Sequence, residues 1–150
     1  MKLKSSAFEN GGKIHSKHTC DGDNVSPPLT ISDVPAEAER LVLIMDDPDV
    51  PAEVREDGMW DHWIVFNIPA SVCNIGEGEE PPGTHGIGTG GNTDYFGPCP
   101  PDREHRYFFK LYAIDVELDL PEGSTKLEVE NAMEGHVLAT AELLGRYERS

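Results

Sequence analysis

The amino-acid sequence predicts a mainly β protein, a predominantly antiparallel β-sandwich with a few peripheral helices. Segments of strand-like composition outnumber helix-like ones, and glycine- or proline-rich turns separate them along the 150 residues. The clearest strand, Arg106 to Ile114, is mostly aromatic or aliphatic, as expected for a strand that is at least half buried. A chain of this length normally forms one domain, so we expect a single domain spanning residues 1–150.

The first thirty residues hold short extended pieces joined by turns. Lys2 to Phe8 fits a short edge strand, and Asn10-Gly11-Gly12 is strong turn chemistry before a second extended piece, Lys13 to Thr19. We expect Cys20 to Leu29 to be a loop, because Ser26-Pro27-Pro28 is held extended by its prolines. Such loops more often cover a sheet edge than bind a ligand.

Two central strands are predicted around an acidic loop. Leu41 to Met45 is a short apolar run bounded by polar residues, which indicates a strand buried on both faces. The β-branched and aromatic residues of His62 to Asn67 indicate the second strand. Between them, the carboxylates and prolines of residues 46–51 indicate a functional site, with an ordinary Asp-Pro turn as the alternative. Ala52 to Gly58 is a polar connection.

Cys73 to Asp94 is predicted to be a long loop rich in glycine, glutamate and proline. Such loops tend to be functional or mobile. Gly86 to Gly91 formally fits G-x-G-x-x-G, but no strand precedes it and the prolines after Tyr95 exclude the helix that would bind a phosphate. We therefore reject a dinucleotide site and interpret His85 as a loop residue.

The C-terminal part is expected to contain the only substantial helix. Ser124 or Thr125 is a suitable cap for a helix of about ten residues that begins near Lys126. Leu138 to Tyr147 allows either a last strand or a longer helix, because alanine, glutamate and leucine dominate it.

Composition limits the classes of partner. With 12 basic and 28 acidic residues the net charge is −16, which opposes binding to nucleic acid or to anionic membranes. A well-solvated surface and adaptation to high intracellular salt both explain this excess. The N-terminus lacks an apolar signal-like core and no apolar run approaches the roughly 20 residues of a membrane span, so we expect a cytoplasmic protein without membrane insertion.

The three cysteines are irregularly spaced and form no C-x-x-C pair. This pattern suggests neither a disulfide framework nor a zinc site. We therefore expect reduced thiols, and no metal or cofactor.

The junction before the clearest strand is where chemistry is expected. Prolines at 98, 100 and 101 stiffen the loop, and Gly97 permits close approach of the backbone to a ligand. His105 and Tyr107 are two residues apart on an extended chain, so their side chains point to the same side of the sheet.

Four motifs in order resemble the phosphatidylethanolamine-binding protein family, in its bacterial and archaeal branch often described as Raf kinase inhibitor-like. They are CDGDNVSPPL (20–29), DDPDVP (46–51), DHWIVFNIP (61–69) and YFGPCPPDREHRYFFKLYAID (95–115). The resemblance implies Greek-key connections, a strand at Leu138 to Tyr147, and a homodimer. It also implies a cis Val50-Pro51 bond, which would hold the two carboxylates of the acidic loop at the pocket.

The same resemblance implies a pocket for a phosphate or a phosphorylated head group. The matching positions are Asp47, Asp49, His62, Gly97, Pro98, Pro101, His105 and Tyr107. Two carboxylates beside a phosphate require compensating protons, supplied by cationic His62 and His105 or by an aspartic acid that keeps its proton. Tyr107 and backbone N–H groups would be neutral donors.

These features predict a non-enzymatic binding protein, because no nucleophile with a positioned base is evident and no catalytic residue is assigned. The alternative is a metal-dependent hydrolase that uses His62, His105 and Asp47 or Asp49 as ligands. A third class, a regulator of kinases or proteases, is implied by the resemblance and is compatible with the same pocket.

Overall fold

The computed structural model describes residues 1–150 as two β-sheets, one α-helix and one short 3-10 helix. The small sheet has the order β1 (Lys2–Lys4), β3 (Leu29–Ser32), β6 (Asn74–Ile75). The large sheet has the order β2 (Gly12–Lys13), β9 (Val137–Tyr147), β8 (His105–Ile114), β4 (Arg40–Asp47), β5 (Trp60–Pro69), β7 (Thr84–His85). The helices are η1 (Ser16–His18) and α1 (Lys126–Met133).

The topology is antiparallel apart from the short pairing of β2 with β9, which is parallel. After the β4–β5 hairpin, the chain passes through β6 and β7 and returns as β8 on the other side of β4. This long return is the Greek-key connection expected for the sandwich. It brings the ends of β4, β5 and β8 together.

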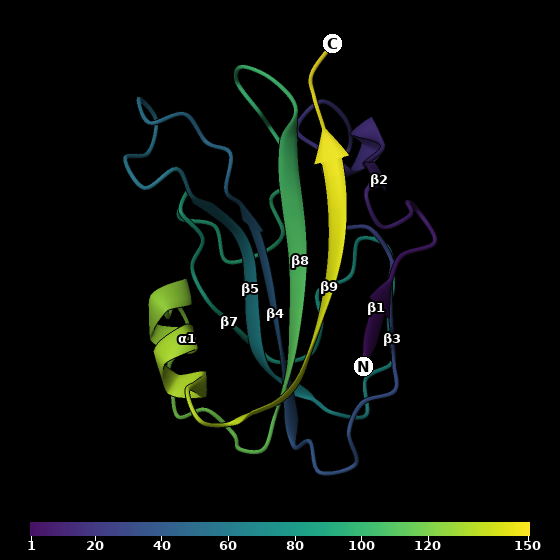
Figure 1. Cartoon of the computed structure of the whole chain (residues 1–150), viewed down its shortest axis with the longest axis vertical. Coiled ribbons are helices and arrows are strands. Elements are labelled where there is room, and N and C mark those ends of the chain that lie inside the picture. The colour runs from purple at the N-terminus through teal and green to yellow at the C-terminus, as the bar shows by residue number, and fades with distance from the viewer.

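The large sheet separates two hydrophobic clusters. The larger cluster has 17 buried residues and lies between the two sheets, where Leu3 and Ile31 of the small sheet meet Phe109 of β8. The smaller has eight, including Val129 and Met133 of α1. Figure 1 accordingly shows α1 and the strands β1 and β3 on opposite sides of the large sheet. A strand covered on both faces must be apolar throughout, which explains the continuous apolar run in β4.

The predicted central strands are confirmed. Leu41 to Met45 lies within β4, His62 to Asn67 within β5, and Arg106 to Ile114 within β8. The segment Leu138 to Tyr147 forms β9, which pairs along the whole of β8. Pairing with β8 and burial of alternate side chains therefore outweigh its helix propensity.

The predicted helix is also confirmed. Thr125 is the N-cap of α1, and its side chain accepts a hydrogen bond from the backbone N–H of Glu128. The Glu128 carboxylate accepts in return from the N–H of Thr125, which completes a capping box.

The N-terminal expectations hold only in part. Within Lys2 to Phe8, only Lys2–Lys4 is a strand. Lys13 to Thr19 is not extended throughout, because residues 16–18 form η1. The wrong prediction arose from a local capping bond, since His15 Nδ1 accepts from the N–H of Lys17 at 3.1 Å.

The predicted long loop contains two short strands, β6 in the small sheet and β7 in the large sheet, and main-chain hydrogen bonds attach it to β5. Gly86 N–H donates to the carbonyl of Ile64 at 2.8 Å, and Thr89 N–H donates to that of Asp61 at 2.9 Å. No helix follows the glycine-rich motif, in agreement with the rejection of a dinucleotide site.

The expectation of reduced thiols is wrong for two of the three cysteines. Cys20 and Cys99 form a disulfide, with their Cα atoms 5.5 Å apart. This pairing could not be predicted from the sequence, because the two cysteines are 79 residues apart and only the folded chain brings their loops together. The N–H of Cys20 also donates to the carbonyl of Pro98 at 3.1 Å. Cys73 is free and exposed.

The expectation of a cis Val50-Pro51 bond is also wrong, since the chain contains no cis peptide bond. The acidic loop is closed instead by Val50 N–H, which donates to the carbonyl of Gly58 at 3.1 Å. A trans bond therefore suffices to turn the chain here.

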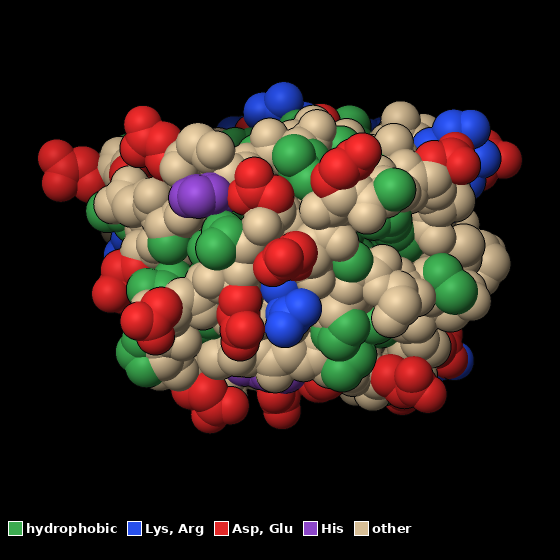
Figure 2. Space-filling view, turned by 90° about the horizontal axis from the view of Figure 1, so that it is seen from below, with side chains coloured by type: hydrophobic (Ala, Val, Ile, Leu, Met, Phe, Trp, Pro, Cys, Tyr) green, Lys and Arg blue, Asp and Glu red, His purple; other side chains and the backbone are tan.

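Acidic side chains are scattered over the end of the molecule that Figure 2 shows. The red acidic groups there lie among uncharged atoms and a few blue basic ones. Neither helix has the length and apolar character needed to cross a bilayer.

Candidate functional site

A pocket of about 240 Å³ lies where the ends of β4, β5 and β8 meet the proline-rich loop. It is lined by Asp47, Val50, Val54, Trp60, His62, Phe96, Cys99, Pro100, Pro101, His105 and Tyr107. Five of the eight predicted site residues are in this lining, namely Asp47, His62, Pro101, His105 and Tyr107. The other three, Asp49, Gly97 and Pro98, lie beside it in the chain but do not line it.

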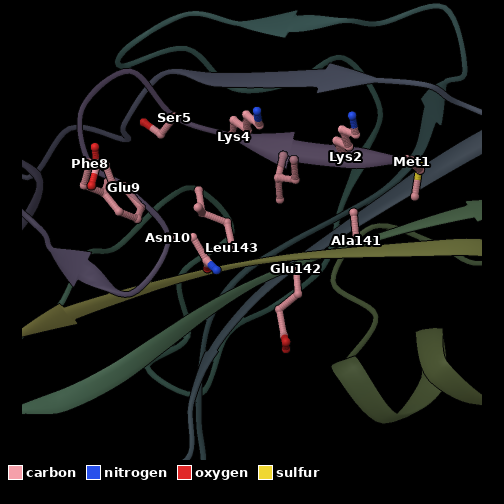
Figure 3. A pocket seen from close by; sticks show the side chains of 11 residues that line it. Met1, Lys2, Lys4, Ser5, Phe8, Glu9, Asn10, Ala141, Glu142 and Leu143 are labelled. Atoms are coloured by element: carbon pink, nitrogen blue, oxygen red, sulfur yellow. The ribbon is translucent and has the colours of Figure 1, made fainter.

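The largest hollow, of about 470 Å³, lies elsewhere, between β1 and β9. In Figure 3 the side chains of Lys2 and Lys4 point away from β9, and Glu142 points to the opposite side of β9 from Leu143. No histidine, aspartate or cysteine lines this hollow. We place the site in the smaller pocket, because there buried titratable groups converge on a largely apolar wall.

His105 is held between two carboxylates. Its Nδ1 lies 2.6 Å from Asp47 Oδ2, and its Nε2 lies 2.7 Å from Asp102 Oδ1. An ionised carboxylate only accepts hydrogen bonds, so both ring nitrogens donate when both carboxylates are ionised. The hydrogen bond from His105 lowers the pKa of Asp102, whereas burial raises the pKa of Asp47. No ring N–H of His105 is therefore free for a ligand.

Asp49 is bound by Arg106 at the outer edge of the site. Its Oδ2 accepts from the Nε and the backbone N–H of Arg106, and its Oδ1 accepts from Nη2, each at 2.9 Å. These bonds from Arg106 lower the pKa of Asp49. Asp49 is thus ionised at neutral pH and cannot be the aspartic acid that keeps its proton.

His62 faces the pocket as a neutral ring. Its Nδ1 lies 2.8 Å from the carbonyl oxygen of Phe96, which can only accept, so Nδ1 carries a proton. Burial lowers the pKa of His62, which counts against the alternative in which a cationic His62 supplies the compensating charge. The neutral ring leaves Nε2 as a hydrogen-bond acceptor.

Tyr107 presents a hydroxyl group without a partner. The residue is fully buried, and its oxygen makes no hydrogen bond of standard geometry, although the carboxylate of Asp47 is close enough to act on it. Its ring lies between those of His62 and His105, with centroids 5.4 and 6.4 Å away. Burial, and then the carboxylate of Asp47, raise the pKa of Tyr107 well above its usual range, so the phenol keeps its proton. A buried donor left unpaired costs free energy unless a ligand or water accepts its proton.

The loop that forms the wall is fixed to the N-terminal part of the chain. Gly97 N–H donates to Asn24 Oδ1 at 2.8 Å, and the hydroxyl of Tyr95 donates to the carbonyl of His18 at 2.7 Å. A side chain at Gly97 would collide with the backbone of His18. Glycine is therefore required here by the contact between the two loops, which the Cys20–Cys99 disulfide also joins.

Several residues of the site were not predicted from the sequence. Asp102 and Arg106 bind predicted residues, and Cys99, Trp60 and Phe96 line the pocket. Only Asp102 had a local signal, since it precedes His105 by three residues in a loop.

The geometry does not favour the two-histidine metal centre of the alternative hydrolase. Three of the four ring nitrogens of His62 and His105 already face an oxygen atom at 2.6 to 2.8 Å. The residues Glu80, His85 and Asp94, which are of metal-ligating types, lie close together elsewhere. There His85 Nδ1 lies 2.9 Å from the carbonyl of Thr93, so this nitrogen already serves a hydrogen bond.

Comparisons with known proteins agree on one family. The model of the phosphatidylethanolamine-binding protein family matches residues 4–148. A UPF0098 protein of Chlamydia muridarum is 54% identical over 99% of both chains, and one of Methanothermobacter thermautotrophicus is 49% identical with the same coverage.

Solved structures agree as well. A putative phosphatidylethanolamine-binding protein homolog from Chlamydia trachomatis, CT736, superposes with a TM-score of 0.97 at 52% identity, over 99% of this chain and 97% of the other. YbcL of E. coli gives 0.88 at 29% identity, over 99% and 98%.

Proposed function

The chain belongs to the phosphatidylethanolamine-binding protein family, and on that premise we propose that it binds a small anion, a phosphate or a phosphorylated head group, without catalysing a reaction. The observation that carries this proposal is the buried hydroxyl of Tyr107, a donor that has no partner in the protein. A phosphate oxygen in the pocket would accept its hydrogen bond and remove the cost of leaving it unpaired.

The second polar group of the pocket narrows the chemistry of the ligand. Neutral His62 offers Nε2 as an acceptor, so the ligand gains from carrying a proton of its own. A phosphate group near its second pKa of about 6 has both a protonated and an unprotonated oxygen. It can therefore accept from Tyr107 and donate to His62, whereas sulfate can only accept. The apolar wall, with Val50, Trp60 and Phe96, would cover the rest of the bound molecule.

The test is calorimetry with inorganic phosphate at about pH 6.5, with sulfate as the comparison anion. We expect phosphate to bind more tightly than sulfate. Tyr107→Phe should weaken phosphate binding about tenfold or more, because it removes a hydrogen bond to a charged group worth roughly 1.5 kcal/mol or more. Tyr112→Phe, on the same strand but packed on the helix side of the sheet, is the matched control. Equal affinities of Tyr107→Phe and the parent protein, or no binding by the parent, would reject the proposal.

Protein partners, self-association and location belong to the same proposal. A kinase or protease would meet the pocket at its mouth, where Val54 and Phe96 are exposed, and its capture should fail with Tyr107→Phe.

A homodimer is expected to appear in native mass spectrometry. The expected cytoplasmic location requires that the Cys20–Cys99 disulfide persist there, although disulfides are rare in that compartment. Thiol counting on rapidly quenched cells would test this.

A further inference from the structure

The N–H group that His105 could offer to a ligand is already taken by a neighbour in the chain. Asp102 Oδ1 lies 2.7 Å from His105 Nε2, and Asp47 holds the other ring nitrogen. A carboxylate oxygen and a phosphate oxygen accept the same charge-assisted hydrogen bond. Asp102 therefore stands in the position that an anionic ligand of His105 would need.

We propose that Asp102 is a built-in competitor of the anion: it occupies Nε2–H of His105 in the free protein and must swing out before a phosphate oxygen can take that bond. This inference deepens the proposed function and rests on it. It assigns to Asp102 a role in setting affinity, through His105, for the same pocket.

The two carboxylates on His105 differ in their freedom to move. The side chain of Asp47 is 4% exposed, and its Oδ1 also accepts from the N–H of Asp49 at 2.8 Å. The side chain of Asp102 is 38% exposed and belongs to an exposed loop segment, Pro101 to Arg103. Asp102 can thus leave His105 without moving a strand, whereas Asp47 cannot.

The displaced carboxylate has a place to go. A second hollow of about 420 Å³ lies on the other side of the wall formed by Pro100 and Pro101, since these two prolines line both cavities. Asp102 lines this hollow rather than the pocket, together with Arg103, Arg149 and the acidic residues Asp21 and Glu148. Arg149 is already paired with Asp21 at 2.9 Å, so Arg103 is the cation open to Asp102. Arg103 Nε is already 3.6 Å from Asp102 Oδ2. Rotation of Asp102 towards Arg103 would replace the bond to His105 by an exposed ion pair.

Displacement also removes the main electrostatic conflict in the site. With Asp102 in place, a phosphate would meet two carboxylates, those of Asp47 and Asp102, at one histidine ring. With Asp102 turned out, the phosphate takes its place at His105, and Asp47 is the one carboxylate that remains on this ring. Because Asp102 is tethered three residues from His105, its effective concentration is high, and only a well-fitted anion displaces it.

The experiment compares phosphate affinity among single variants by calorimetry at about pH 7. Asp102→Ala frees Nε2–H and should bind inorganic phosphate about tenfold more tightly than the parent, or better. Asp102→Asn keeps an accepting oxygen but loses its charge, so it should lie between the two. Glu53→Gln is the matched control, because Glu53 is an exposed acidic residue beside the pocket residue Val54 and has no ion pair. Its affinity should stay within about twofold of the parent.

Proton NMR of the imidazole N–H groups supplies a readout that does not depend on affinity. The parent should show protected signals for both ring N–H groups of His105, and Asp102→Ala should lose the Nε2–H signal until phosphate is added. Equal phosphate affinities of the parent and both Asp102 variants would overturn the competitor role and leave the proposed function intact. Absence of phosphate binding in all folded variants, the parent included, would overturn the proposed function and this inference with it.

Discussion

Reduction of the Cys20–Cys99 disulfide should strongly destabilise the protein. The bond joins residues 79 apart in the sequence. In the chain-entropy account, a cross-link that closes a loop of this length lowers the entropy of the unfolded chain. This loss raises the free energy of unfolding by about 4.5 kcal/mol at 25 °C. This value is a ceiling, because an unfolded chain with residual structure loses less entropy when it is cross-linked.

The assay is urea unfolding followed by circular dichroism, with and without a reductant. For an m-value of about 2 kcal/mol per M, the ceiling corresponds to a midpoint lowered by about 2 M. The double variant Cys20→Ser, Cys99→Ser should reproduce the reduced protein. Cys73→Ser is the control, because Cys73 is free and exposed and its replacement should leave the midpoint unchanged.

The disulfide also connects stability to the site, since Cys99 lines the pocket. Reduced protein that is still folded should bind phosphate more weakly, because the proline wall is then held to the N-terminal loop by hydrogen bonds alone. Identical unfolding midpoints for oxidised and reduced protein would refute the reasoning. They would mean that the cross-link does not restrict the unfolded chain.

Three further predictions concern pH, the helix and salt. The free energy of unfolding should fall as pH drops below about 6.5, because the unfolded chain protonates His62, which the fold keeps neutral. His62→Gln should flatten this dependence in urea titrations between about pH 5 and 7.5, and an unchanged slope would contradict the prediction. Thr125→Ala should cost about 1 kcal/mol of unfolding free energy through loss of the N-cap, and a cost near zero would deny that the cap contributes. The association rate of phosphate should rise with ionic strength, because the net charge of −16 repels the anion and salt screens this repulsion. A rate that falls with added salt in stopped-flow or NMR line-shape measurements would contradict this prediction.

The strands and the helix were predictable because their signals are local. The apolar run of β4 and the aromatic run of β8 reflect burial that each strand needs wherever it pairs. Both partners of the capping box of α1, Thr125 and Glu128, lie within four consecutive residues, so the sequence alone indicates the start of the helix. By contrast, β9 could not be told from a helix by its residues alone, because its strand conformation depends on pairing with β8.

The pairing of charged groups in the site could not be predicted in the same way. The positions of His62, His105 and Tyr107 followed from motifs, but their hydrogen-bond partners lie far away in the sequence. Asp47 binds a histidine 58 residues later, and Asp49 an arginine 57 residues later. The ionised state of Asp49 follows from its distant partner Arg106, and the neutral state of His62 follows from its burial; neither is visible in the local sequence.

The resulting pocket does not collect anions by charge. Both ring nitrogens of His105 face carboxylates, burial keeps His62 neutral, and the chain carries a net charge of −16. On the proposed function, a ligand would be selected by the direction of its hydrogen bonds. It would accept from the hydroxyl of Tyr107, donate to Nε2 of His62 and, once Asp102 is displaced, accept from Nε2–H of His105. If the pocket binds phosphate as proposed, it should favour a partly protonated phosphate over fully ionised anions of the same size, because extra negative charge adds repulsion without adding a bond.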